Sequence, residues 1–234
     1  MAGLIDMPAA AIDSASASLF PAILDAETRF GRCVVVRLEP AADAGAAAIA
    51  ALLHRDEQAL CRDMRRPRLI AFAGGRLAAG LAKQGTAATG TPTLIASDGP
   101  PIPTNGVAVS ISHSRTCAAA LAASMPGWGV GVDIETLEGG DTGALLAERI
   151  LSDAECTADA RCVPIPVLWR LSLKEAVYKA LFPRLGHVPL RHIEVTRPFG
   201  AVPGYAIAVR GQETSVAADA MEFRGHVLSF AAAQ

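Results

Sequence analysis

The stretch GVGVDIE, residues 129–135, places two acidic residues in a segment that otherwise has the small and β-branched residues of a strand. Acids are depleted in strands, so their presence here needs a reason. Alternate residues of a strand face the same side, so Asp133 and Glu135 share a face with Gly129 and Gly131, and the apolar residues between them face the core. The glycines leave room for a close approach to the acidic face.

Two carboxylates on one strand face repel each other unless a cation lies between them. A hard divalent cation, Mg²⁺ above all, binds such oxygens together with the phosphates of a substrate. The alternative is an edge strand whose acidic face simply lies in water. A third partner is needed to decide between these interpretations.

The stretch LSLKEAVYKAL, residues 171–181, offers such a partner on a predicted helix. Ser172, Glu175 and Lys179 fall on the side opposite its apolar stripe. Glu175 and Lys179 are four residues apart, so they can form an ordinary surface ion pair. Alternatively, Glu175 is a third carboxylate ligand of the metal, and Lys179 binds a phosphate. The apolar stripe has helical spacing and consists of Leu173, Ala176, Val177, Ala180 and Leu181.

A third polar segment, SISHSRT at residues 110–116, follows an apolar strand. Ser112 and His113 at the end of this strand suit contacts with a phosphate. The alternative is a turn histidine without a function. Elsewhere, Ser152 followed by Glu155 indicates the N-cap of a helix.

Composition limits the class of protein. The chain has 234 residues, of which 51% are hydrophobic and 19% charged, with a net charge of −2. We therefore expect a globular protein without the bulk charge that attracts nucleic acid or a membrane. The five cysteines form no CxxC pair, which favours reduced thiols in the cytoplasm. The acidic start is unlike a signal peptide, and no apolar run has the length of a membrane span.

The order of predicted elements repeats, with a strand, helices and then three strands in each half. This predicts two α+β subdomains, 1–126 and 127–234, packed as a pseudo-dimer with a ligand site in the cleft between them. Because the pseudo-dimer replaces a true one, we expect a monomer. The predicted strands are 33–38, 93–96, 107–112, 118–123, 128–135, 192–196, 205–209 and 226–231, and the predicted helices are 41–61, 69–83, 142–151, 152–160 and 167–182.

The motifs SISHS, GVGVDIE and LSLKEAVYKAL, in this order, resemble those of the Sfp-type 4′-phosphopantetheinyl transferases. The resemblance is greatest to the branch that serves enterobactin-like siderophore synthesis, and it extends from about Arg66 to Pro183. It implies a pseudo-twofold pair of α+β subdomains with coenzyme A (CoA) in the cleft between them. The resemblance also implies that a serine of an acyl or peptidyl carrier protein would attack the β-phosphate of CoA, with 3′,5′-ADP as the leaving group.

The resemblance also implies roles for individual residues. The N-terminal half would contact the nucleotide and phosphates of CoA, and the C-terminal half would hold the metal. Asp133, Glu135 and Glu175 match the Mg²⁺ ligands of the family, and Glu175 also matches the proposed general base. Lys179 matches the lysine on the pyrophosphate, Ser112 and His113 match residues at the CoA phosphates, Arg76 matches an arginine near the nucleotide, and Arg66 and Arg68 resemble basic residues at the 3′-phosphate.

The chain departs from the family pattern at three places. Leu171 replaces an aromatic residue, Gly80 replaces a second arginine, and the segment 97–106 lacks the usual Lys–Pro or Trp–Pro pair. CoA binding then depends more on Arg66, Arg68 and Arg76, or is weaker. For Arg66 and Arg68, an ordinary solvated basic cluster is the alternative. For the whole protein, the alternatives are a non-catalytic module that binds carrier protein or CoA, and another Mg²⁺-dependent enzyme that cleaves diphosphates.

Overall fold

The chain forms two compact units, Met1–Pro126 and Gly127–Gln234. The computed structural model describes residues 18–39, 44–96, 99–137, 143–159, 164–197 and 204–234. The predicted helical residues 41–43, 142 and 160, and also Cys162, lie outside these ranges. Among the described residues, Cys33, Cys61, Cys117 and Cys156 form no disulfide. None of the described helices is long and apolar enough to cross a membrane.

The N-terminal unit is an antiparallel sheet with a long helix on it. The strand order is β1-β2-β4-β3, and α4 packs against β2, β3 and β4 over an apolar core. The strands are β1 (Ala22–Thr28), β2 (Gly31–Arg37), β3 (Ala108–His113) and β4 (Cys117–Ala123), and the helices are α2 (Ala46–Ala51), α3 (Arg55–Leu60) and α4 (Arg66–Ala82).

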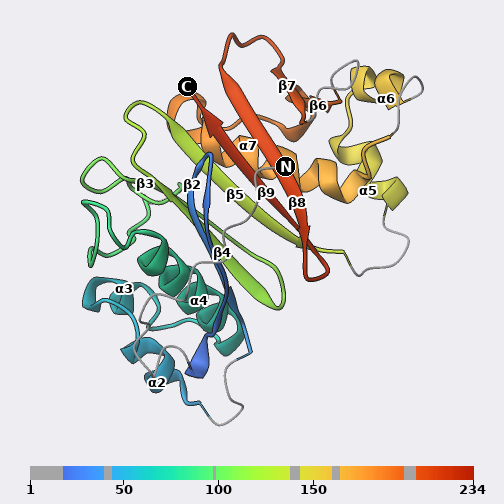
Figure 1. Cartoon of the computed structure of the whole chain (residues 1–234). Coiled ribbons are helices and arrows are strands. Elements are labelled where there is room, and N and C mark those ends of the chain that lie inside the picture. The colour runs from blue at the N-terminus through green and yellow to red at the C-terminus, as the bar shows by residue number, and fades with distance from the viewer. Residues whose placement is uncertain (1–17, 40–43, 97–98, 138–142, 160–163, 198–203) are drawn as a thin grey trace. The chain divides into compact units, whose positions relative to one another are not determined.

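The C-terminal unit is built around a three-stranded antiparallel sheet of order β5-β9-β8. Helix α7 packs against all three strands (Figure 1). The strands are β5 (Gly129–Thr136), β6 (Ile193–Thr196), β7 (Ala206–Val209), β8 (Val216–Phe223) and β9 (His226–Ala233). The helices are α5 (Gly143–Ile150), α6 (Asp153–Asp159), α7 (Val167–Leu185) and the short 3-10 helix η1 (Leu190–His192).

Three neighbouring strands of the N-terminal sheet have the same order as the three strands of the C-terminal sheet. In the N-terminal unit β2 pairs with β4 and β4 with β3, and in the C-terminal unit β5 pairs with β9 and β9 with β8. The long helix that follows the first of these strands in the chain, α4 after β2 and α7 after β5, packs on the sheet of its unit. The predicted α+β class is therefore confirmed.

Several predicted elements differ from the structure. Residues 93–96 form no strand but only an isolated bridge between Ile95 and Pro101. The single helix predicted over 41–61 is interrupted, because His54 caps a new helix together with Glu57. Strands β1 and β8 were not predicted. Their sequences, AILDAET and VAADAMEF, lack strict apolar alternation, and pairing with β2 and β9 fixes them instead.

Candidate active site

The glycines of β5 allow the backbone of α7 to approach the strand. A Cβ atom on Gly131 would overlap the carbonyl oxygen of Ala176, and one on Gly129 would overlap that of Ala180. The sequence predicted a close approach to this face, and the structure shows that the approaching group is helix α7. Any larger residue at these positions would push the helix away.

This close packing joins the acidic residues of β5 to α7. The Nζ atom of Lys179 donates hydrogen bonds to Asp133 Oδ1 at 2.7 Å and to the carbonyl of Val132 at 3.1 Å. Asp133 is 3% exposed, so its carboxylate does not lie in water as the edge-strand alternative requires. The lysine is thus held at the carboxylate by two acceptors of the strand.

Two more carboxylates lie within electrostatic reach. Burial, together with the charges of Asp133 and Glu175, raises the pKa of Glu135 to about 7 against the opposing effect of Lys179. Burial also raises the pKa of Glu175, which Lys179 lowers and Asp133 raises. We call these four residues, Asp133, Glu135, Glu175 and Lys179, the carboxylate cluster. Its acids repel each other, and one lysine does not neutralise three of them.

The donor set suits a hard divalent cation. Carboxylate oxygens are ligands that Mg²⁺ prefers, and a cation would relieve their mutual repulsion. Ser229, opposite Asp133 in the pairing of β5 with β9, has a buried hydroxyl without a hydrogen-bond partner among the described residues. As the described side chains stand, however, no three His, Cys, Asp or Glu residues are grouped to hold a metal ion.

Helix α7 is more buried than its sequence indicated. The apolar stripe is buried as predicted, but Ser172 and Lys174, both outside it, are also completely buried. Ser172 lies opposite the apolar stripe, but this side of the helix is covered as well. Helix α7 packs on the sheet on one side and against α5, β6 and η1 elsewhere, which buries Ser172 and Lys174. Glu175 and Lys179 are half-buried.

The remaining predicted site residues lie in the N-terminal unit. Ser112 and His113 end β3 as predicted, with Ser112 half-buried and His113 exposed. The following turn is fixed by the hydroxyl of Ser114, which accepts hydrogen bonds from the backbone N–H groups of Thr116 and Cys117 at 3.3 and 3.2 Å. The turn thus holds the two residues at a defined strand end.

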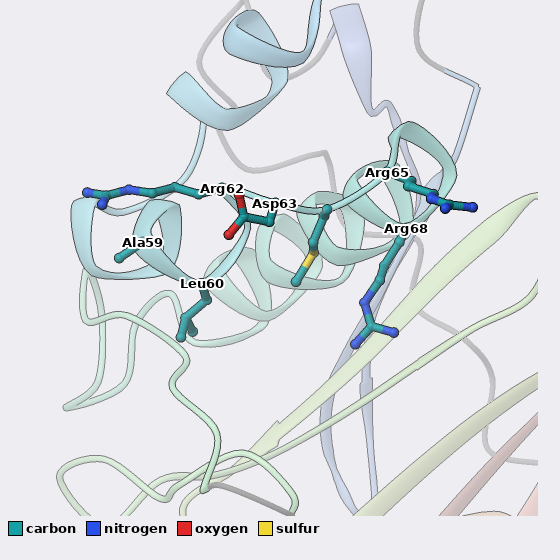
Figure 2. A pocket seen from close by; sticks show the side chains of 7 residues that line it. Ala59, Leu60, Arg62, Asp63, Arg65 and Arg68 are labelled. Atoms are coloured by element: carbon teal, nitrogen blue, oxygen red, sulfur yellow. The ribbon is translucent and has the colours of Figure 1, made fainter.

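Arg66 and Arg68 lie in the first turn of α4, and both are exposed. Arg66 donates a hydrogen bond to the carbonyl of Ala44 at 2.5 Å. Arg68 lines a hollow of about 360 Å³, and Figure 2 shows Arg65 and Arg68 near each other while Arg62 extends in the other direction. This end of the helix carries positive charge, but the three guanidinium groups do not converge on one point.

Arg76 lies further along α4, beside a second hollow of about 350 Å³. Its guanidinium group lies 4.1 Å from the centre of the Phe72 ring. Its Nε atom is buried and has no hydrogen-bond partner among the described residues. Burial lowers the pKa of Arg76, and the charge of Glu57 opposes this effect.

A buried ionic group at helix α7 was not predicted from the sequence. Glu155 was predicted only as a capping residue, and its reciprocal hydrogen bonds with Ser152 confirm that role. It also contacts both Arg170 and Lys174 of α7. The sequence contains one signal of this group, because Arg170 and Lys174 are like charges four residues apart on one helix. Such a pair is unfavourable unless an acidic residue lies between the two charges.

Two protein families match the chain. The model of the 4′-phosphopantetheinyl transferase superfamily matches residues 129–231, and that of the 4′-phosphopantetheinyl transferase N-terminal domain matches residues 56–123. Over these two ranges the chain matches the 4′-phosphopantetheinyl transferase superfamily. The superfamily match contains the whole carboxylate cluster, and the N-terminal match contains Arg66, Arg68, Arg76, Ser112 and His113.

Solved structures also resemble parts of the chain. The holo-[acyl-carrier-protein] synthase of Thermotoga maritima is 22% identical with a TM-score of 0.36, and the match covers 45% of this chain and 62% of that one. The ACPS–CoA complex of Chronobacterium ammoniagenes is 17% identical with a TM-score of 0.36, and the match covers 46% of this chain and 97% of that one. A search of curated proteins found no match.

Proposed function

We propose that this protein transfers 4′-phosphopantetheine from CoA to a serine of an acyl or peptidyl carrier protein. The observation that carries the proposal is the carboxylate cluster of β5 and α7, which lies within the range that matches the superfamily. Asp133, Glu135 and Glu175 would hold Mg²⁺. When bound, this ion would supply positive charge against the diphosphate of CoA.

In this reaction the serine oxygen forms a bond to the β-phosphorus of CoA. The bond from that phosphorus to the bridging oxygen breaks, and 3′,5′-ADP leaves with the electron pair. Glu175 would take the serine proton, directly or through water. Its raised pKa makes it a stronger base than an ordinary carboxylate, and Lys179 would donate a hydrogen bond to the diphosphate.

The basic and hydroxyl groups of the N-terminal unit would bind CoA. The positive charge at the beginning of α4 favours Arg66 and Arg68 as partners of the 3′-phosphate, and the Nε donor of Arg76 favours a contact with the nucleotide. Ser112 and His113 would contact the phosphates. The C-terminal unit would then carry the chemistry, and the N-terminal unit would recognise the donor.

The motif resemblance supports an Sfp-type enzyme of the siderophore-serving branch. The shared strand order of the two units supports a monomer, because each chain then contains two related halves. Described cysteines that form no disulfide support a reducing compartment such as the cytoplasm. Retention of the entire carboxylate cluster favours a catalyst over a binding module, since pure binding has no need for this set.

Incubation with apo carrier proteins, CoA and Mg²⁺ tests the proposal. We expect mass spectrometry to show the phosphopantetheine mass on an acyl or peptidyl carrier, with equimolar release of 3′,5′-ADP. Mixtures that lack Mg²⁺, or that contain a carrier whose acceptor serine is replaced by alanine, are the controls. Cleavage of CoA without modification of a carrier would indicate a diphosphate-cleaving enzyme. Binding of CoA or carrier without cleavage would indicate a non-catalytic module. Either result would contradict the proposal.

A further inference from the structure

The carboxylate of Glu155 is completely buried in the C-terminal unit and accepts several donors. Its Oε2 atom accepts hydrogen bonds from Lys174 Nζ at 2.7 Å and from the backbone of Ser152 at 2.8 Å. Its Oε1 atom accepts the backbone N–H of Val195 at 2.9 Å and lies 3.5 Å from Arg170 Nε. One acid thus joins α6, β6 and two turns of α7.

The two cations of this group also bind backbone carbonyls around them. Lys174 Nζ donates to Ile150 O at 2.5 Å and to Leu190 O at 3.2 Å, and Arg170 Nε donates to Val195 O at 3.2 Å. Lys174 and Arg170 are completely buried. We call Glu155, Arg170 and Lys174 the Glu155 clamp. The clamp ties one side of α7 to α6, to the end of α5 and to the segments around β6.

The clamp lies next to the carboxylate cluster in the sequence of the helix. Successive helical residues are rotated by about 100°, so a fixed Lys174 determines the direction of Glu175. Lys179 is four residues after Glu175 and lies on nearly the same side. The glycines of β5 set the distance between strand and helix, whereas the clamp opposes rotation of the helix about its own axis.

Stability alone does not account for the clamp. Burying charged groups costs free energy, and apolar residues of similar volume often replace buried ion pairs without loss of stability. The clamp carries two cations and one anion, and the charge of Glu194 also acts on Lys174. We propose that Glu155, Arg170 and Lys174 are positioning residues that fix the rotation of α7, so that Glu175 and Lys179 face Asp133. The inference rests on the proposed function.

Lys174→Met is the main test variant, because it leaves Glu155 opposite Arg170 as a neutral pair. Glu155→Gln is a second variant that keeps the shape of the cap. Val209→Ala removes buried apolar atoms from β7, where no clamp residue lies, and serves as the control for lost packing. All three are compared with the wild type at a temperature where each is fully folded by circular dichroism.

We expect both clamp variants to lower kcat at least 10-fold and to change KM for CoA less than threefold. We also expect calorimetric titration of Mg²⁺ without CoA to show about 10-fold weaker binding, because residues that orient metal ligands contribute about 10–100-fold to metal affinity or activity. Val209→Ala should match the wild type in both measurements. Clamp variants that behave like Val209→Ala would overturn the inference.

A third measurement separates this inference from the proposed function. If the wild type transfers nothing to any carrier, the proposed function fails, and amide hydrogen exchange of residues 175–181 decides about the clamp. Exchange at least 10-fold faster in Lys174→Met than in Val209→Ala would support a clamp that holds this part of α7. Equal exchange in the two variants would overturn it.

Discussion

Asp133 and Glu135 are two residues apart on β5 but differ in their surroundings. Asp133 is buried and bound to Lys179, whereas Glu135 is half-buried nearer the end of the strand. We therefore expect Asp133→Ala to lose more transfer activity than Glu135→Ala, since water can replace a ligand at the more open position. Titration of Mg²⁺ against both variants checks this ranking. Equal losses at saturating Mg²⁺ would contradict it.

Glu135 should also make the stability of the metal-free protein depend on pH. Its pKa is about 7 in the folded chain against an ordinary value of 4.5. The folded state therefore binds more protons than the unfolded state between these values, and stability falls as pH rises from about 4.5 to about 7. The raised pKa of Glu175 acts in the same direction.

Urea denaturation of Glu135→Gln across this pH range measures the effect. Because the amide does not titrate, we expect the free energy of unfolding to fall less steeply with pH than in the wild type. The control is Glu148→Gln, which changes an exposed glutamate of α5. A slope in Glu135→Gln as steep as that of the wild type would show that the carboxyl does not titrate in the folded protein as described.

At the scale of elements, the contact between β5 and α7 depends on two glycines. A methyl group at Gly131 would overlap the carbonyl of Ala176, so we expect Gly131→Ala to lower the free energy of unfolding by about 1–3 kcal/mol or more. It should also lower transfer activity, because the helix that carries Glu175 moves away from the strand. Urea denaturation and the carrier assay measure the two effects.

Gly80→Ala is the matched control for this substitution. Gly80 lies within α4, and a Cβ atom there would meet nothing within 4 Å. Alanine in a helix interior is favoured over glycine by roughly 0.5–1 kcal/mol, so this variant should be slightly more stable than the wild type. A free energy of unfolding for Gly131→Ala as high as that of Gly80→Ala would show that β5 and α7 are not packed this closely.

The same two elements show what the sequence could predict. Strand β5 and helix α7 were predicted to within a few residues because their apolar patterns are strongly periodic. The glycines indicated a close approach, but periodicity does not identify the partner. The burial of Lys174 was not predicted, because its partners Ile150, Glu155 and Leu190 are distant in sequence and meet it only in the folded unit.

Strands β1 and β8 mark the other limit of prediction. Both are rich in alanine and acidic residues, which have low strand propensity, and tertiary pairing overrides this preference. In β1 the pairing is reinforced across the strands by Arg32, which contacts both oxygens of Asp25 at 2.8 Å. Such a pair is recognisable only when the register is known.

In the molecule as a whole, we propose that the N-terminal unit recognises CoA. If Arg66, Arg68 or Arg76 binds the 3′-phosphate, its replacement by alanine should raise KM for CoA and leave that for dephospho-CoA nearly unchanged. A charge-assisted hydrogen bond contributes about 1.5–3 kcal/mol, which corresponds to roughly 10–150-fold in affinity.

Steady-state kinetics with both substrates on each variant provides the measurement. Arg55→Ala is the control, because this arginine of α3 has a side chain that is 88% exposed and pairs with its neighbour Asp56. An unchanged preference for CoA over dephospho-CoA in all three variants would place the 3′-phosphate site elsewhere on the chain. Equal changes for both substrates would indicate that the arginines only form a solvated basic surface.

We propose that the carboxylate cluster of β5 and α7 performs the transfer. Single-turnover transfer to an apo carrier by Glu175→Gln, at saturating CoA and Mg²⁺, is the decisive measurement, with the same substitution at the exposed Glu148 as the control. We expect a folded Glu175→Gln protein that is about 10²–10⁴-fold slower than the wild type, because the amide provides neither the negative charge nor the base. A Glu175→Gln protein that transfers at nearly the wild-type rate would show that the cluster does not perform the reaction.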